Sequence, residues 1–287
     1  MSLKARLQNS KILVAPGVYD GLTAALATDA GFEALYLSGA AVAYTRLGRP
    51  DIGLSTASEM ADTMALIADR TPLPVIIDAD TGFGNALNAQ RTMRVYERAG
   101  ASALQLEDQS YPKRCGHLAD KSLISSAEMA GKISAMADAR ASEETLIIAR
   151  TDAIAVEGFS AALDRAESYI KAGADVLFVE APQDRAQLEE IGTRFAGRIP
   201  LLANMVEGGA TPITNAGDLE QQGFSIAIFP GGIVRAIGRT AQAYYDSLQA
   251  NGSNKLFADR MFDFNGLNDV IGTNEQLEIG ASYDVKD

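Results

Sequence analysis

The sequence predicts a closed (β/α)₈ barrel, and three observations carry that prediction. First, one phrase recurs along the 287 residues: a helical segment ends in Gly, and a short apolar run follows. Second, about eight such runs alternate with amphipathic segments, as strands alternate with crossover helices in a parallel sheet. Third, no Pro- or Ser-rich linker divides the chain, which favours one closed barrel over an open sheet.

Each expected strand is a continuous apolar run, because a parallel strand is buried on both faces. In chain order the runs occupy residues 12–15, 34–39, 75–77, 103–108, 146–149, 176–181, 201–203 and 225–231. Segments between them, such as 86–99 and 159–172, show the periodicity of amphipathic helices. At four joints from helix to strand stand Gly31, Gly100, Gly173 and Gly223. These positions favour the left-handed backbone that often ends a helix.

The chain continues beyond the eighth run through residues 235–287, which is more than the last barrel helix requires. We therefore predict a single domain over 1–287, with 240–287 as a C-terminal helical extension. Such an extension packs either on its own barrel or on a neighbouring subunit, and the residues leave both arrangements open.

The composition excludes several classes of protein. A formal net charge of −12 argues against a nucleic-acid partner, because such partners are held by clustered Lys and Arg. The single cysteine, Cys115, allows no intramolecular disulfide, which fits a reducing compartment. The N-terminus lacks the apolar core of a signal peptide, and no run is long enough to cross a membrane. We expect a cytoplasmic enzyme that acts on a small molecule.

Acidic residues follow neighbouring strands at the end where barrel enzymes carry their active sites. Asp78 and Asp80 follow the third expected strand, and Glu107 ends the fourth. Like charges this close are costly unless a cation neutralises them, and an all-oxygen set suits Mg²⁺, with Mn²⁺ as an alternative. A salt-bridged or solvated rim is the other interpretation. Since no Lys stands at a strand end, a Schiff-base aldolase is disfavoured and a metal-stabilised enolate replaces it.

A second cluster lies in the loop 108–123, which has the length of a lid over the site. Here Cys115 lies beside Lys113, Arg114 and His117, a cationic setting that lowers the pKa of a thiol. Such a thiol can donate a proton to a carbanion. The alternatives are a buried cysteine that only packs, a histidine that only orders the turn, and an ordinary surface loop.

Several motifs in order resemble the isocitrate lyase and phosphoenolpyruvate mutase superfamily. They are DADTGFGN (78–85), LEDQ (106–109), KRCGH (113–117), ARTDA (149–153), Pro50-Asp51 with the GLST that follows, and Asn204 with EGGATP (207–212). The resemblance covers the chain from Ile12 to about Leu267. It implies a (β/α)₈ barrel in a homotetramer, with the last helix exchanged between subunits.

The resemblance also implies roles for individual residues. Asp78 and Asp80 would hold Mg²⁺, and Asp51 and Glu107 would reach it through water. The expected catalytic residues are Cys115, Tyr36, His117 and Lys113, with Tyr36 as the candidate base. The expected substrate-binding residues are Ser38, Gly39, Ala40, Gly116, Arg150, Glu180, Asn204 and Arg235. Tyr36 also has a simple alternative as a packed strand residue.

Within this family the KRCGH loop indicates the carbon–carbon lyases, which cleave a 2-hydroxy dicarboxylate to a 2-oxo acid such as pyruvate. The 2-methylisocitrate lyases usually carry a further Arg where this chain aligns Phe264, and a glycine run where it has Ala40 and Ala41. We therefore expect a substituted malate without the third carboxylate, as in the 2,3-dimethylmalate lyase and petal-death relatives. A 2-methylisocitrate-like substrate stays open, and the alternatives to such a lyase are an oxaloacetate hydrolase, a phosphonate-processing mutase and a catalytically silent barrel.

Overall fold

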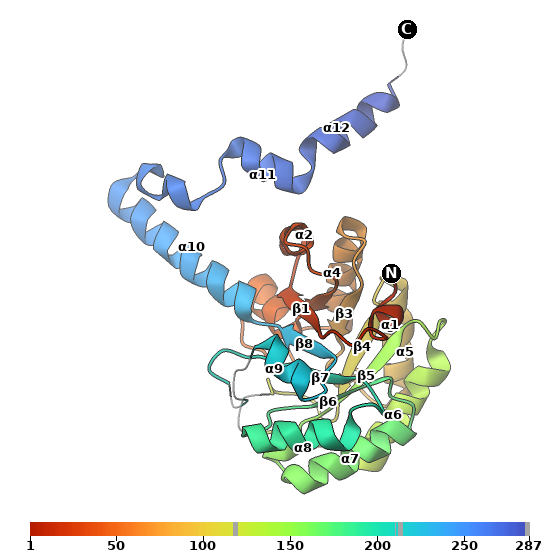
Figure 1. Ribbon diagram of the computed structural model, residues 1–287. Coiled ribbons are helices and arrows are strands. Elements are labelled where there is room, and N and C mark those ends of the chain that lie inside the picture. The colour runs from red at the N-terminus through yellow and green to blue at the C-terminus, as the bar shows by residue number, and fades with distance from the viewer. Residues whose placement is uncertain (117–119, 210, 212–214, 285–287) are drawn as a thin grey trace. The chain divides into compact units, whose positions relative to one another are not determined.

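The computed structural model describes residues 1–116, 120–209, 211 and 215–284, and it contains a closed barrel of eight parallel strands (Figure 1). Each strand pairs with the next in the chain, and β1 pairs with β8 to close the sheet. The strands are β1 Leu13–Val18, β2 Leu35–Leu37, β3 Val75–Asp78, β4 Ala103–Glu107, β5 Leu146–Thr151, β6 Val176–Val179, β7 Leu201–Asn204 and β8 Ile226–Phe229. Each of the eight predicted runs overlaps one of these strands, so the predicted fold is confirmed.

The helices alternate with the strands along the chain. They are α1 Leu3–Arg6, α2 Gly21–Asp29, α3 Gly39–Val42, α4 Ala57–Arg70, α5 Ala86–Arg98, α6 Ser126–Ala139, α7 Phe159–Lys171, α8 Arg185–Phe195, α9 Ala216–Gln221, α10 Gly232–Asn251, α11 Phe264–Ile271 and α12 Thr273–Ser282. Shorter turns of other helix types are η1 Ala43–Leu47, η2 Ala153–Ala155 and η3 Lys255–Arg260. The predicted helical segments 86–99 and 159–172 correspond to α5 and α7.

The four joint glycines adopt the predicted left-handed backbone. Their φ angles are 84° at Gly31, 100° at Gly100, 106° at Gly173 and 89° at Gly223. A residue with a Cβ pays a steric cost in this region, whereas Gly does not. These residues therefore end each helix sharply and return the chain to the sheet.

Apolar side chains form two layers, one inside the barrel and one between the sheet and the surrounding helices. Tyr36 faces the barrel interior with side chains such as Ile76 and Phe178. Its neighbours Leu35 and Leu37 face outward and pack against the surrounding helices. This alternation follows from the twofold period of a strand. At the other end of the interior, Leu3 of α1 packs in the same cluster.

The chain divides into two compact units, Met1–Ile233 and Val234–Asp287. In the described part of the second unit Phe257 is the only buried hydrophobic residue, and it packs edge to face on Tyr244 at 5.5 Å. Other large apolar side chains of this unit are exposed, including Phe264 at 84% and Leu277 at 65%. The predicted exchange of the last helix between subunits stays a prediction. None of the described helices combines the length and apolar character needed to span a bilayer.

Candidate active site

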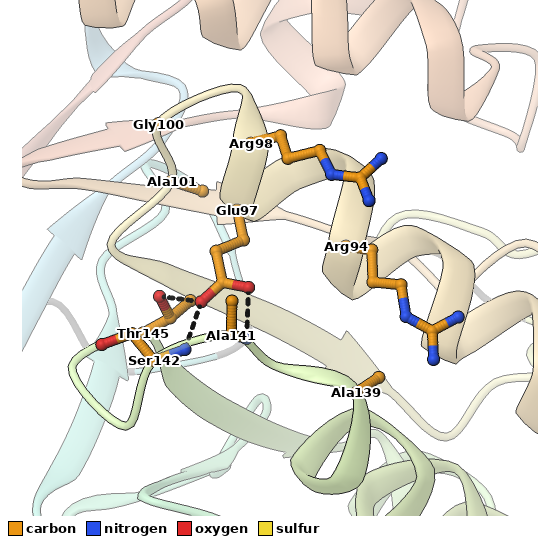
Figure 2. A pocket seen from close by; sticks show the side chains of 9 residues that line it. All are labelled: Arg94, Glu97, Arg98, Gly100, Ala101, Ala139, Ala141, Ser142 and Thr145. Carbon is orange, nitrogen blue, oxygen red and sulfur yellow. Dashed lines mark hydrogen bonds between the residues drawn. The ribbon is translucent and has the colours of Figure 1, made fainter.

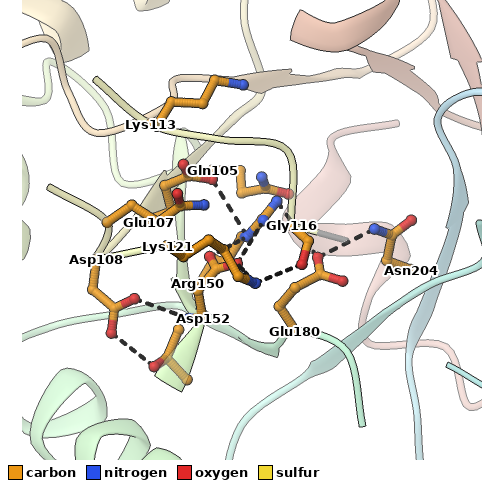
Figure 3. A network of polar contacts seen from close by, with 12 residues as sticks. Gln105, Glu107, Asp108, Lys113, Gly116, Lys121, Arg150, Asp152, Glu180 and Asn204 are labelled. Carbon is orange, nitrogen blue, oxygen red and sulfur yellow. Dashed lines mark hydrogen bonds and ion pairs between the residues drawn. The ribbon is translucent and has the colours of Figure 1, made fainter. Parts of the chain in front are cut away.

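The carboxyl ends of the barrel strands carry most of the polar side chains singled out in the sequence. Glu107 ends β4, Arg150 lies near the end of β5, Glu180 follows β6 and Asn204 ends β7. Because the strands run parallel in one closed sheet, these ends meet at one mouth of the barrel. Figure 3 shows these four side chains together. The structure thus brings these predicted residues together.

The four predicted metal ligands lie in one buried region around Lys113. The Nζ atom of Lys113 lies 2.5 Å from Asp51 Oδ1 and 2.8 Å from Asp80 Oδ1. Asp78 joins them because its Oδ1 accepts the backbone N–H of Asp80 at 3.1 Å. Glu107 is tied to the same place through its N–H, which donates to the Asp80 carbonyl at 2.9 Å. Lys113 therefore contacts the acidic group directly.

The acidic group carries more negative charge than the adjacent cations compensate. Burial raises the pKa of Asp80 to about 7, against the opposing charge of Lys113. Burial also raises the pKa of Asp78, and it raises that of Glu107 well above the usual range. A raised carboxyl pKa means that the ionised form is poorly stabilised where it lies. The site therefore favours a further positive charge.

The donor set fits a hard divalent cation in its chemistry. All four candidate ligands are carboxylates, and Glu107 Oε1 is buried without a hydrogen-bond partner among the described residues. No three acidic, His or Cys side chains in the described ranges are grouped closely enough to hold a metal ion. Positive charge between Asp51 and Asp80 comes instead from Lys113. The assignment of these carboxylates as metal ligands stays a prediction.

Arg150 is the centre of the second half of the site. Its guanidinium makes a paired contact with Asp152, at 2.8 Å from Nε and 3.0 Å from Nη2. It also lies 3.4 Å from Glu107 and 3.5 Å from Glu180, and it stacks over the Phe178 ring. These carboxylates raise the pKa of Arg150 well above its usual range, so it remains charged. The arrangement presents a fixed cation toward the mouth.

Glu180 and Asn204 form one pair beside this arginine. The Asn204 amide donates to Glu180 Oε2 at 3.2 Å, and Asn204 Oδ1 is buried without a partner in the described part of the chain. A buried amide oxygen that lacks a donor is suited to a ligand that brings one. Both residues therefore stay candidates for binding substrate oxygens.

The predicted loop residues contact both halves of the site. Cys115 is half-buried, and its N–H donates to the Asp51 carbonyl at 3.3 Å. Gly116 is buried, and a Cβ added to it would lie 2.3 Å from Arg150 Nη2 and 3.0 Å from the Glu180 side chain. A side chain at this position would therefore require the loop, Arg150 or Glu180 to move. His117 lies outside the described residues.

The residues after β2 line the acidic half of the site. Ser38 is buried, and its hydroxyl caps α3 by accepting the N–H of Ala41 at 3.2 Å. A Cβ on Gly39 would lie 3.0 Å from Asp78 Oδ2, so its backbone lies against that carboxylate. Ala40 follows on α3 and is half-buried. Their substrate-binding roles stay predictions.

Tyr36 lies deeper in the barrel than its neighbours after β2. Its hydroxyl donates to Gln105 Oε1 at 3.0 Å. Burial, and next the charge of Asp78, raise the pKa of Tyr36 well above the usual value. A base needs the ionised form, so this environment favours a neutral hydroxyl that orients a neighbour. The role of general base therefore stays a prediction.

The sequence interpretation gave no role to three buried residues of this network. Asp152 holds Arg150, Asp108 holds Asp152 through its N–H at 2.9 Å, and Lys121 bridges the loop to Asp152 at 2.8 Å. All three appear in Figure 3. In the sequence, only the position of the two aspartates at the ends of strands indicated that they belong to the site. Lys121 gave none, because a lysine in a polar loop is usually exposed.

Arg235 lies in the second unit, on α10, with an exposed side chain. Phe264 lies in the same unit and begins α11. The two units are described separately, so the carboxylate-binding role of Arg235 and the effect of Phe264 on the substrate stay predictions.

A pocket of about 590 Å³ lies elsewhere on the barrel and contains none of the predicted site residues (Figure 2). Its lining includes Ala101 and Thr145, which precede β4 and β5, so it lies opposite the mouth. The Glu97 carboxylate accepts hydrogen bonds there from Ala141, Ser142 and Thr145. These bonds secure the connection from α6 to β5 and indicate a structural role.

Comparisons with known proteins agree with the predicted family. Residues 3–248 match the family model described as phosphoenolpyruvate phosphomutase. The chain is 44% identical over 273 residues to the 2-methylisocitrate lyase of Aeropyrum pernix, covering 95% of this chain and 87% of that protein. It is 38% identical over 281 residues to the 2,3-dimethylmalate lyase of Eubacterium barkeri, covering 98% and 96%.

Solved structures match over nearly the whole length. A crystal structure of 2,3-dimethylmalate lyase, a PEP mutase/isocitrate lyase superfamily member, superposes with a TM-score of 0.92 at 36% identity, covering 97% of this chain and 93% of the other. Oxaloacetate acetylhydrolase with 3,3-difluorooxalacetate gives 0.92 at 31%, covering 99% and 97%. Phosphonopyruvate hydrolase with oxalate and Mg²⁺ gives 0.88 at 27%, covering 98% and 97%. The chain therefore belongs to the phosphoenolpyruvate mutase/isocitrate lyase superfamily.

Proposed function

We propose that the protein is a Mg²⁺-dependent carbon–carbon lyase that cleaves a substituted malate to a 2-oxo acid and a carboxylic acid. The observation that carries this proposal is the similarity over nearly the whole chain to 2-methylisocitrate lyase and 2,3-dimethylmalate lyase. The site supports the proposal, because the half-buried thiol of Cys115 and the charged Arg150 lie at the same mouth of the barrel as the acidic group. The negative charge of that group exceeds the positive charge beside it.

The reaction is a retro-aldol (Claisen-type) cleavage. A general base, for which Tyr36 stays the predicted candidate, removes the proton of the 2-hydroxyl. The bond from C2 to C3 then breaks, and C2 becomes the carbonyl carbon of the 2-oxo acid. The electron pair of that bond passes to C3 and into its carboxylate as an enolate. Arg150 stabilises the charge that develops there, since its guanidinium is fixed by Asp152 before substrate arrives. Cys115 then donates its proton to C3.

The cation would be held by Asp78 and Asp80, with Asp51 and Glu107 reaching it through water. When bound, it supplies a Lewis acid for the 2-hydroxyl and its neighbouring carboxylate. Support comes from the raised pKa values of these buried carboxylates and from the relative whose structure contains oxalate and Mg²⁺. Lys113 keeps the acidic group partly neutralised, and His117 and Lys113 stay in the proposed catalytic set.

The substrate is tested with a panel of acids. With Mg²⁺ present, we expect release of pyruvate from 2,3-dimethylmalate and other malates with a methyl group on C2, with lower kcat/KM for 2-methylisocitrate. The physical reason is Phe264, which cannot pair with a third carboxylate where relatives have Arg. A coupled pyruvate assay measures this, with oxalate release from oxaloacetate followed in parallel.

Each outcome of the panel is decisive. A preference for 2-methylisocitrate contradicts the inference from Phe264 and keeps the lyase. Oxalate release alone makes the protein a hydrolase, an alternative favoured by its similarity to oxaloacetate acetylhydrolase. Silence across the panel contradicts the lyase proposal and favours a phosphonate substrate or a barrel without catalysis.

Mg²⁺ binding is expected to weaken as the pH falls below about 7, because protons compete with the metal for Asp80, whose pKa burial raises to about 7. Above that pH the carboxylate is ionised and the affinity is constant; below it the affinity falls roughly tenfold per pH unit. Calorimetric titration with MgCl₂ measures this, together with proton release.

Two variants make that titration specific. Asp80→Asn should weaken binding and remove the part of its pH dependence that Asp80 contributes, leaving the part due to Asp78 and Glu107, whose pKa values burial also raises. Asp120→Asn should change neither, since the Asp120 side chain is 85% exposed and its ion pair with Arg114, at 3.3 Å, lies outside the acidic group. An affinity for Mg²⁺ that does not change with pH in the wild-type protein would contradict the assignment of Asp80.

We further infer a homotetramer in which the C-terminal extension packs on a neighbouring subunit. The many exposed large apolar side chains of the second unit, such as Phe264 and Leu277, support this, because a partner surface would remove them from water. We also propose a cytoplasmic location, on the ground that the single cysteine forms no intramolecular disulfide.

A further inference from the structure

Lys121 is a buried lysine that connects two parts of the site. Its side chain is 2% exposed, and the Asp152 side chain that it contacts is 0% exposed. The Nζ atom donates to the Gly116 carbonyl at 2.5 Å and to Asp152 Oδ1 at 2.8 Å (Figure 3). A lysine is buried at a large desolvation cost, which only such partners offset.

Asp152, which accepts the hydrogen bond from Lys121, is itself fixed to the barrel wall. Its N–H donates to Asp108 at 2.9 Å. The other oxygen of Asp108 accepts from Thr151 and Tyr169, at 2.7 Å in each case, and lies 3.3 Å from Arg165. Asp108 is 0% exposed. Asp152 is therefore a rigid anchor in the network.

The same anchor holds Arg150 and the loop together. Asp152 Oδ1 accepts both from Lys121 and from Arg150 Nη2, at 2.8 Å and 3.0 Å. On the other side of Lys121 stands Gly116, whose backbone lies so near Arg150 Nη2 that a Cβ would be 2.3 Å away. One ammonium group therefore sets the distance between the loop backbone and the guanidinium.

We propose that Lys121 is a positioning residue, which holds the Cys115–Gly116 backbone in register with the Arg150 guanidinium by bridging Gly116 to Asp152. This inference rests on the proposed lyase function and adds a role that the mechanism above does not use. Lys121 does not touch the reacting atoms. It keeps the thiol that delivers the proton and the cation that receives the charge at one fixed separation.

The consequence for catalysis follows from geometry. Proton delivery from Cys115 and charge stabilisation by Arg150 act on the same enolate, so an error in their separation affects the cleavage step. A displacement of about 1 Å can cost roughly 10²-fold in rate. Ground-state binding through Glu180 and Asn204 is expected to change less, because these residues stand at the ends of β6 and β7 and the Asn204 amide donates to Glu180 at 3.2 Å.

The first test needs neither metal nor substrate. Cys115 is the only cysteine in the chain, so alkylation by iodoacetamide reports on this loop alone. In Lys121→Met the rate should rise about tenfold or more, because loss of one partner of a buried pair favours local opening of the loop. Rates are compared at a pH that fully ionises the thiol, which removes any effect of Lys121 on its pKa.

The second test measures turnover on the best substrate of the panel. Lys121→Met should lower kcat about 10²-fold with a much smaller change in KM. Lys121→Arg keeps a cationic donor and should recover much of both properties. Asp120→Asn, at the neighbouring loop position with an exposed side chain, should match the wild type in both tests.

The outcomes separate this proposal from the lyase assignment. If no panel substrate turns over, the alkylation rates still decide whether Lys121 holds the loop. Wild-type alkylation and wild-type kcat in Lys121→Met would overturn the proposal. So would equal losses in Lys121→Met and Lys121→Arg accompanied by a lower thermal midpoint in both, since that pattern indicates a structural lysine alone.

Discussion

Replacing Cys115 with Ala is expected to lower kcat by about 10²- to 10⁴-fold, the range that a general acid contributes. The reason is that the cleavage leaves an enolate carbon that needs a proton. The half-buried Cys115 lies in the loop next to Gly116, whose backbone lies against Arg150. Steady-state kinetics on the best panel substrate measures the loss, and calorimetry with MgCl₂ should show unchanged metal binding.

A serine variant refines this test. Cys115→Ser keeps the size of the side chain but replaces the thiol by a much weaker acid, so its activity should stay close to that of the alanine variant. Circular dichroism and thermal melting of both variants control for folding. A fully active Cys115→Ala protein would remove the thiol from the mechanism while leaving the lyase assignment in place.

Replacing Gly116 with Ala is expected to reduce kcat/KM by about 10²-fold or more. The added Cβ would lie 2.3 Å from Arg150 Nη2 and 3.0 Å from the Glu180 side chain, so the loop or the guanidinium must move. Because Arg150 is held by Asp152 at 2.8 Å and 3.0 Å, the loop is the part expected to shift. Kinetics on the panel substrate measures the effect.

Gly131→Ala is the matched control for that variant. Gly131 lies within α6, and a Cβ there would meet nothing within 4 Å. The same chemical change should therefore leave kcat/KM unaltered and raise stability slightly, because Ala favours a helix over Gly by about 1 kcal/mol. If Gly116→Ala behaves like this control, the close approach of the loop to Arg150 is not required for catalysis.

The sequence by itself determined the barrel and the end of it that carries the chemistry. Apolar runs, the glycines at the joints and amphipathic periodicity are local properties of the sequence. They are sufficient to predict the order of strands and helices in a parallel barrel. Polar residues that end such runs, including Glu107 and Asn204, must then meet at one mouth. Gly116 was singled out through the motif that contains it, and the structure adds the steric reason.

Only the tertiary structure decided which charges touch. Lys113 lies between Asp51 and Asp80, and Lys121 joins Gly116 to Asp152. The motif singled out Lys113 but not its partners, and nothing in the local pattern singled out Lys121. Such contacts join residues that lie 5 to 62 positions apart in the chain. They depend on how the loop returns over the mouth, and the desolvation of each ion exists only after the barrel has closed.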